Sequence, residues 1–205
     1  MHFAHISTAA ALDLIRAAKA EGLAVTCDTA PPYFDLNETA IGDYRSYAKL
    51  SPPLRTEADR QAVVAALTDG TIDAIASDHQ PRDADDKRLP FAQAEAGGAG
   101  LATLLGVTLA RVHAGDLPML TALALLTARP ANLLDLPQGR LAKGAPADVR
   151  AAGFTATDEF NLAAGCDPDP DPEKWVGYER FMPESLLGLD LFTLQPAGER
   201  RASFY

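Results

Sequence analysis

The chain has 205 residues, 47% of them hydrophobic, which suffices for one ordinary core. Its formal net charge is −10, and no basic stripe is present that could neutralise the phosphates of a nucleic acid. No run reaches the roughly 18 apolar residues of a membrane span, so we expect a chain that binds neither nucleic acid nor membranes. The start MHFAHIST lacks signal-peptide features, and Cys27 and Cys166 form no CxxC pair. We therefore expect a cytoplasmic protein.

The first third of the chain alternates between strand and helix patterns. Residues 2–6 (HFAHI) predict a short strand, and Thr8 is placed to cap a helix that stops at Gly22. Residues 23–28 (LAVTCD) predict the next strand. A long loop over 29–55 follows, and its aromatic residues favour an ordered, packed loop over a disordered one.

The pattern continues with a helix that Thr56 opens and Gly70 closes, followed by a strand over 71–77 (TIDAIAS). A polar, glycine-rich loop over 78–98 leads to helices, which we expect at roughly 100–114, at 118–128 and in ARPANLLDL. Strand, helix, strand, helix, strand, with apolar strands, is typical of a parallel α/β sheet.

Polar residues follow each of the three predicted strands. His5, Asp28 and Asp78 fall at the carboxyl ends of successive strands. In parallel α/β folds this rim carries the functional groups. The sequence therefore predicts that three strands deliver polar side chains to one edge.

The Asp78-His79 pair is the strongest chemical signal at this rim. A carboxylate at a strand end can bind a metal through one oxygen and accept a proton through the other, as metal-assisted attack on an amide requires. His5 suits a metal ligand equally well. The alternatives are that Asp78 caps or orders the next loop and that His5 is structural. A catalytic site needs at least three protein ligands, so others must come from elsewhere.

Two loops are weaker candidates for substrate contacts. KLSPPLR places Ser51 beside a rigid Pro-Pro, and AGGAG (96–100) can bring backbone close to a ligand. The alternatives are a proline-rich turn and a flexible entry to a helix. We interpret His2 and His113 as structural or solvent-facing, and the run Asp85, Asp86, Lys87 and Arg88 as a solvated loop.

Four segments share an ordered pattern with a known family. They are HFAHISTAAALDLIRAAKAEGLAVTCD, KLSPPLRTEADRQAVVAALTDGTIDAIASDH, GGAGLATLL and LLTARPANLLDLPQGRLAKGAPAD. Together, over roughly residues 2–148, they resemble the C-terminal half of bacterial dihydroorotases. These are metal-dependent (β/α)-barrel enzymes of the amidohydrolase superfamily, so the resemblance implies the C-terminal part of a TIM-type barrel.

The resemblance implies roles for particular residues. His5 matches a zinc-binding histidine, and Asp78 matches the aspartate that binds zinc and acts as general acid/base. Ala96 and Gly97 match a loop that contacts the substrate through its backbone. Two substrate contacts differ: the asparagine of the family's NPPLR is Ser51 here, and the last histidine of DHAPH is Arg82. The family's TPHH is APPY here.

The implied reaction is the reversible cyclisation of N-carbamoyl-L-aspartate to dihydroorotate in pyrimidine biosynthesis. The remaining zinc ligands belong to an N-terminal half, so we expect this chain alone to be inactive. We expect domains at 1–148, a partial barrel, and 149–205, an atypical tail; a changed reading frame near Val149 and near Met1 would explain both ends. A homo-oligomer or aspartate transcarbamoylase is an expected partner.

Two alternatives to this function stay open. One is a non-catalytic dihydroorotase-like subunit that scaffolds aspartate transcarbamoylase, which the changes at Ser51 and Arg82 favour and the retention of His5 and Asp78 opposes. The other is a different cyclic amidohydrolase of the hydantoinase or allantoinase type, since the PPLR and RPA segments are partly shared with them.

Overall fold

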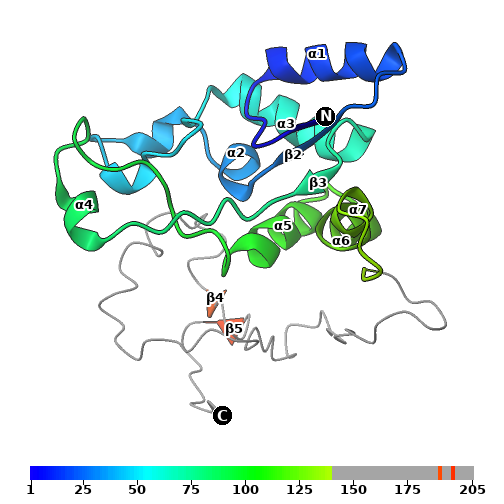
Figure 1. The fold of residues 1–205 in the computed structure, drawn as a ribbon. Helices are drawn as coiled ribbons and strands as arrows, with labels where there is room; N and C mark the ends of the chain where they lie inside the picture. Colours follow the sequence, from blue (N-terminus) through cyan, green and yellow to red (C-terminus); the bar gives the residue numbers. More distant parts are fainter. Residues whose placement is uncertain (140–188, 191–194, 197–205) are drawn as a thin grey trace. The chain divides into compact units, whose positions relative to one another are not determined.

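Three short parallel strands organise the N-terminal part of the chain (Figure 1). They are β1 (His2–Phe3), β2 (Thr26–Thr29) and β3 (Ala74–Ile75), in the order β1-β2-β3. His2 pairs with Thr26, and Asp28 pairs with Ala74. The predicted parallel sheet is confirmed. Each strand is shorter than its sequence pattern, which extended over residues 2–6, 23–28 and 71–77.

This architecture comes from a computed structural model, which describes residues 1–139, 189–190 and 195–196. The chain divides into two units, Met1–Asp148 and Val149–Tyr205. In the second unit only the antiparallel strands β4 (Leu189–Asp190) and β5 (Gln195–Pro196) are described. The predicted atypical tail falls almost entirely outside the described residues and stays a prediction. Within the described part, no helix is both long and apolar enough to cross a membrane.

Two helices connect the strands, and both begin at the predicted caps. Helix α1 (Ala9–Ala20) starts at Thr8, whose hydroxyl accepts from the Ala11 amide at 3.3 Å. Helix α3 (Glu57–Asp69) starts at Thr56, whose hydroxyl accepts from the Asp59 amide at 3.2 Å, and it ends at Gly70 with a φ of 83°. Glycine commonly ends a helix because, having no Cβ, it adopts the left-handed backbone conformation without steric cost. These three predictions are confirmed.

The long connection after β2 is ordered, as predicted. It contains α2 (Pro31–Asp35) and the 3-10 turns η1 (Glu38–Ile41) and η2 (Ser46–Ala48). Tyr33 and Phe34 are buried and anchor it to the core. Tyr44 is 76% exposed, and its ring meets the Phe91 ring edge-on at 5.9 Å. The aromatic packing is therefore concentrated in α2.

The segment after β3 departs from one expectation. Residues 84–88 form a short helix, α4 (Ala84–Arg88), and Lys87 is only 3% exposed. The interpretation of this charged run as a solvated loop is wrong for Lys87, because its ammonium finds backbone acceptors inside the protein. Helices α5 (Leu104–His113), α6 (Met119–Leu126) and α7 (Ala128–Leu133) follow, close to the predicted positions.

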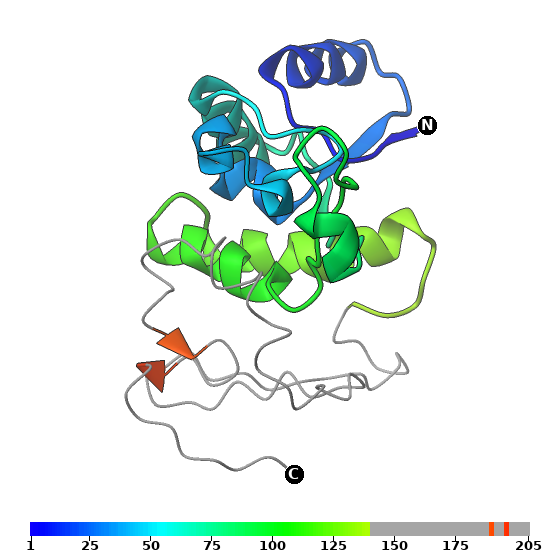
Figure 2. The same ribbon diagram turned by 90° about the vertical axis from the view of Figure 1, so that its left-hand side faces the viewer.

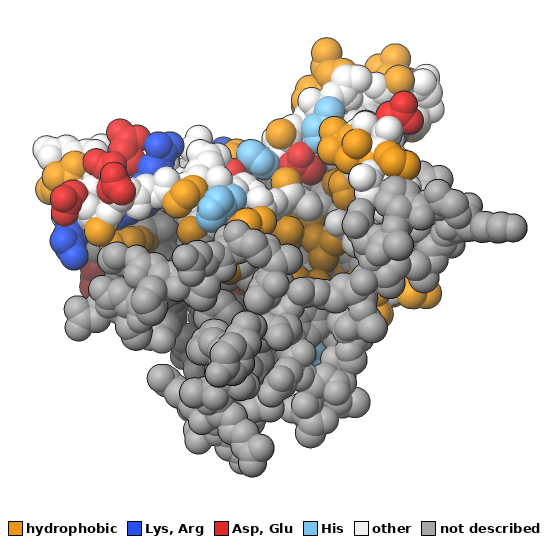
Figure 3. Space-filling model, turned by 60° about the horizontal axis from the view of Figure 1, so that its bottom comes forward, with side chains coloured by type: hydrophobic (Ala, Val, Ile, Leu, Met, Phe, Trp, Pro, Cys, Tyr) orange, Lys and Arg blue, Asp and Glu red, His pale blue; other side chains and the backbone are white. Residues whose placement is uncertain are grey.

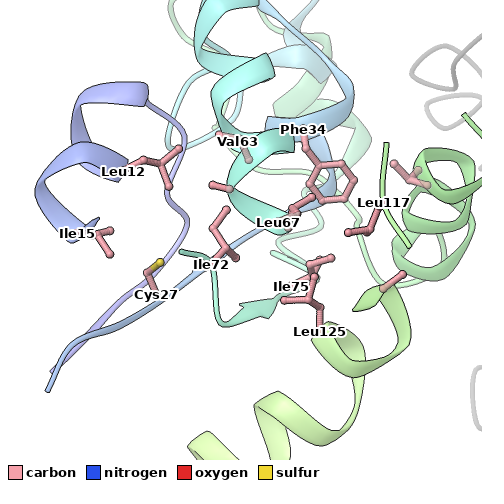
Figure 4. Close-up of a cluster of buried hydrophobic side chains, with 13 residues drawn as sticks. Leu12, Ile15, Cys27, Phe34, Val63, Leu67, Ile72, Ile75, Leu117 and Leu125 are labelled. Atoms are coloured by element: carbon pink, nitrogen blue, oxygen red, sulfur yellow. The ribbon is translucent and has the colours of Figure 1, made fainter. Parts of the chain in front are cut away.

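One apolar core joins the sheet to both groups of helices (Figure 4). Figures 1 and 2 both show α5, α6 and α7 on the side of the strands away from α1. Leu12 of α1 and Leu67 of α3 meet the strands from one side, and Leu125 of α6 meets them from the other. Full burial of such a side chain contributes about 1.5–3 kcal/mol, so this core holds the strand ends in place.

Candidate functional site

His5 and Asp78 come together at the ends of β1 and β3. Their Nδ1 and Oδ1 atoms lie 3.6 Å apart, and the side chains are 28% and 7% exposed. Both residues have left-handed backbones, with φ values of 55° and 46°. Non-glycine residues rarely adopt this region, and such strained positions concentrate at functional sites. The fold therefore unites the two residues that the sequence singled out as metal ligands.

Asp28, at the end of β2, holds the backbone of His5. Its Oδ1 accepts from the His5 backbone amide at 2.7 Å, and its Oδ2 lies 2.9 Å from Nε2 of His2. The other nitrogen of His2 lies 2.8 Å from the Thr26 hydroxyl. His2 is thus structural, as predicted, and Asp28 helps to fix the unusual backbone of His5.

Two further side chains, which the sequence did not predict, hold Asp78. The Tyr33 hydroxyl lies 3.1 Å from Asp78 Oδ2, and the Gln80 side-chain amide donates to Asp78 Oδ1 at 2.6 Å. Burial, with the adjacent Asp78 carboxylate, raises the pKa of Tyr33 well above its usual range, so the phenol keeps its proton. The available signals were an aromatic residue in the APPY segment after β2 and an amide two residues beyond the aspartate.

Tyr33 connects the loop that carries Ser51 to Asp78. The Tyr33 hydroxyl is also 3.1 Å from the carbonyl oxygen of Pro52, which follows Ser51 through a cis peptide bond. Ser51 itself is exposed. One phenol therefore links the loop that carries a candidate substrate contact to the candidate metal ligand.

The remaining candidate substrate contacts form a second group. Arg82 is exposed, and its Nε donates to the Ala96 carbonyl at 2.9 Å, while the Gly97 amide donates to the Lys49 carbonyl at 2.9 Å. A Cβ on Gly97 would lie 2.6 Å from the Gln80 carbonyl oxygen. Only glycine permits this approach, so the glycine-rich loop packs tightly against the segment that follows Asp78.

Lys87 ties this second group together. Its ammonium donates to the carbonyl oxygens of Ser46, Lys49 and Glu95, at 3.2, 3.3 and 2.8 Å. The Ser46 hydroxyl in turn donates to the Lys87 carbonyl. Burial lowers the pKa of Lys87, and the nearby positive charges add to the effect. No sequence signal marked this lysine, since it lies in a run of charged residues.

His79 has a local structural role. Its Nδ1 accepts from the backbone amides of Gly100 and Leu101, both at 3.2 Å. That contact closes the loop between β3 and α5. His79 therefore orders the loop, whereas its neighbour Asp78 points to the strand ends.

The donor set fits part of a metal site. Imidazole nitrogen and carboxylate oxygen both suit zinc, and His5 and Asp78 are close enough to share one ion. Within the part of the chain that the structure describes, no group of three or more His, Cys, Asp or Glu side chains could hold a metal. The described residues thus bring together two candidate ligands, one fewer than a catalytic zinc site takes from its protein.

One face of the described part of the chain mixes polar and apolar side chains. Figure 3 shows histidine and acidic side chains close together, among apolar side chains, on one face. Several large apolar side chains are exposed, including Phe3 of β1 (41%) and Leu101 (51%). β1 forms one edge of the described sheet.

Comparison with known proteins gives a consistent family. The model of the amidohydrolase family matches residues 2–164. The chain is 47% identical over 148 residues to a dihydroorotase of Anaplasma phagocytophilum, covering 72% of this chain and 33% of that protein. It is 48% identical over 149 residues to a dihydroorotase of Syntrophotalea carbinolica, covering 73% and 35%. The chain spans about a third of the length of these relatives.

Solved structures show the same fold. The L-hydantoinase (dihydropyrimidinase) of Arthrobacter aurescens has a TM-score of 0.68 and 28% identity, covering 71% of this chain and 34% of that one. The dihydropyrimidinase of Brevibacillus agri has a TM-score of 0.67 and 25% identity, covering 71% and 34%. The three-stranded sheet and its helices thus correspond to part of a TIM-type amidohydrolase barrel, as expected.

Proposed function

The chain belongs to the amidohydrolase family, and from that premise we propose that it supplies the C-terminal part of a zinc-dependent dihydroorotase. The proposed reaction is the reversible cyclisation of N-carbamoyl-L-aspartate to dihydroorotate. The observation that carries the proposal is the meeting of His5 and Asp78 at 3.6 Å, in strained backbone, at the ends of β1 and β3. The similarity to proteins named dihydroorotase supports this substrate.

In this proposal His5 and Asp78 bind zinc, and Asp78 also acts as the general acid/base. A bound zinc ion would lower the pKa of a water molecule and polarise the amide carbonyl. Tyr33 and Gln80 fix the Asp78 carboxylate in place, and a fixed position is what proton transfer to or from the reacting amide requires. Asp28 keeps His5 in position through its backbone amide.

The proposed substrate contacts are Ser51, Arg82, Ala96 and Gly97. Ser51 lies on the loop that Tyr33 links to Asp78. Arg82 is exposed beside the glycine-rich loop, and its guanidinium suits a substrate carboxylate. The other zinc ligands would come from outside the described residues, in strands of the N-terminal half of the barrel. A homo-oligomer or a complex with aspartate transcarbamoylase is the proposed assembly. We also propose a cytoplasmic location.

The test is complementation. The 205-residue chain is assayed for dihydroorotate hydrolysis alone and after mixing with the part of the Syntrophotalea carbinolica dihydroorotase that this chain does not match. We expect no turnover from either piece alone, and zinc-dependent turnover from the mixture. Turnover by the 205-residue chain alone would show that the described pair is not half a site.

Matched variants assign the activity to the two proposed ligands. His5→Ala and Asp78→Asn should each abolish turnover in the mixture, while His113→Ala, on the exposed end of α5, should leave it unchanged. Full activity of the His5 or Asp78 variant contradicts the proposal.

Two other functions have specific support. A hydantoinase-type substrate is favoured by the solved hydantoinase and dihydropyrimidinase structures, and hydrolysis of dihydrouracil rather than dihydroorotate would establish it. A non-catalytic subunit that scaffolds aspartate transcarbamoylase is favoured by Asp78, whose two oxygens both have protein partners. Co-purification with aspartate transcarbamoylase, without turnover in the mixture, would establish that role.

A further inference from the structure

The two oxygens of Asp78 have different partners, and the difference concerns the metal. Oδ2 is the oxygen near the Tyr33 hydroxyl. Oδ1 accepts from the Gln80 amide at 2.6 Å and is also the oxygen 3.6 Å from His5 Nδ1. The oxygen that faces His5 is therefore the one that Gln80 already occupies.

A buried carboxylate needs compensation for the water it has lost. The Asp78 side chain is 7% exposed, and the positive end of an amide N–H provides part of that compensation. A cation shared with His5 would approach the same oxygen. The Gln80 side chain and a metal ion thus compete for one atom.

The backbone around Gln80 is fixed without its side chain. The Gln80 amide nitrogen donates to the Gly98 carbonyl at 2.8 Å, and the Gln80 carbonyl packs against Gly97. Removing the side-chain amide therefore leaves the loop in place. The position of the Gln80 backbone is therefore independent of the contact between its side chain and Asp78.

From this arrangement we propose that Gln80 is a positioning residue that substitutes for the metal. It holds the Asp78 carboxylate ready in the metal-free protein, and it weakens metal binding because it must release or share Oδ1 when an ion enters. This inference rests on the proposed metal role of His5 and Asp78. It adds a residue that sets the affinity of the pair for a divalent cation.

The test uses the 205-residue chain and Zn²⁺ alone. Calorimetric titration of Gln80→Ala should show about tenfold tighter Zn²⁺ binding than the unmodified chain, because the ion no longer has to displace a hydrogen bond to the charged Oδ1 atom. Gln80→Glu should bind Zn²⁺ more tightly still, since its carboxylate adds a possible metal ligand beside Asp78. Gln93→Ala, an exposed glutamine in the same loop, is the matched control and should not change the affinity.

Thermal unfolding separates this role from a purely structural one. In EDTA, Gln80→Ala should melt a few degrees below the unmodified chain, because Asp78 loses a donor. Saturating Zn²⁺ should raise its melting temperature by more than it raises that of the unmodified chain. A structural role alone would lower both melting temperatures equally, and that result overturns the proposal.

A double variant separates the role of Gln80 from the metal-binding role of His5. His5→Ala placed in the Gln80→Ala background should remove the gain in Zn²⁺ affinity. If the double variant binds as tightly as Gln80→Ala, the ion does not sit on His5, and the proposed function fails with the inference. If His5→Ala alone weakens binding but Gln80→Ala does not strengthen it, only the role of Gln80 is overturned.

Discussion

Two groups of side chains differ in the charge of the group that organises them: carboxylates in one and an ammonium in the other. In the strand-end cluster, formed by His2, His5, Asp28 and Asp78, carboxylates accept hydrogen bonds from an amide and side chains. In the loop cluster, formed by Lys49, Arg82, Lys87 and Gly97, a buried ammonium donates to backbone carbonyls.

The contrast shows how each cluster obtains its geometry. Regular strands deliver the carboxylates, and the sheet fixes their spacing. The loop cluster has no strand to align it, so one cation gathers three carbonyls from separate segments. Accordingly, the strand-end cluster should depend on its carboxylate acceptors, and the loop cluster should depend most on its buried donor, Lys87.

The largest effect is expected at Lys87. Lys87→Met removes the ammonium, so the Glu95, Ser46 and Lys49 carbonyls each lose a hydrogen bond from a charged donor, although the last two keep a backbone amide. This loss should lower the free energy of unfolding by about 3 kcal/mol. Its neighbour provides the control: Arg88→Met, at a side chain 75% exposed, should change it by less than about 0.5 kcal/mol. Urea unfolding measures both. Equal losses in the two variants would mean that Lys87 does not organise the loop cluster.

Gly97 tests the tight packing within the same cluster. Gly97 has a φ of 130°, and a Cβ there would meet the Gln80 carbonyl, so Gly97→Ala should lower the free energy of unfolding by about 2–3 kcal/mol. At Gly98 a Cβ would meet only the movable end of Leu50. Gly98→Ala should therefore cost less than about 1 kcal/mol. The same urea experiment compares them, and a reversed order contradicts the close approach.

Asp28 tests the acceptor side of the comparison. Asp28→Asn keeps an acceptor oxygen for the His5 amide but removes the negative charge that strengthens both hydrogen bonds of Asp28, so the free energy of unfolding should fall by about 1–2 kcal/mol. Asp13→Asn, at a side chain 76% exposed, should have almost no effect. Hydrogen exchange of the His5 amide provides a local measurement. Unchanged protection of that amide in Asp28→Ala, which has no acceptor oxygen, would show that Asp28 does not hold His5.

The smallest effect is expected at an exposed ionic group outside both clusters. Hydrogen bonds from Arg60 and Asn37 lower the pKa of Glu57 to about 2. Because this pKa is below that of the unfolded chain, about 4.3, the stabilisation is present above pH 4.3 and is lost as the pH falls toward 2. The side chain is 45% exposed, so solvent screening keeps the contribution below about 1 kcal/mol.

A pH series measures that contribution. The difference in unfolding midpoint between the unmodified chain and Glu57→Gln should be largest near pH 6 and shrink as the pH is lowered toward 3. A difference that grows on acidification would reverse the sign of the linkage. Its small size would show that exposed ion pairs stabilise this chain less than the buried contacts of either cluster.

The sequence by itself determined the parallel alternation, the helix caps at Thr8 and Thr56, and the placement of His5, Asp28 and Asp78 at one rim. These features follow from local rules, since hydrophobic periodicity and capping chemistry act within a few residues. The family motifs also pointed to the amidohydrolase barrel, which the comparisons confirmed.

Only the tertiary structure decided which side chains meet. Tyr33 and Gln80 reach Asp78 from separate segments, and Lys87 reaches carbonyls up to 41 residues away in the chain. Hydrogen-bond partners depend on distances that chain folding sets, and local patterns carry no information about them. For that reason the sequence identified the ends of the strands, whereas the hydrogen bonds that hold Asp78 and the burial of Lys87 are seen only in the folded chain.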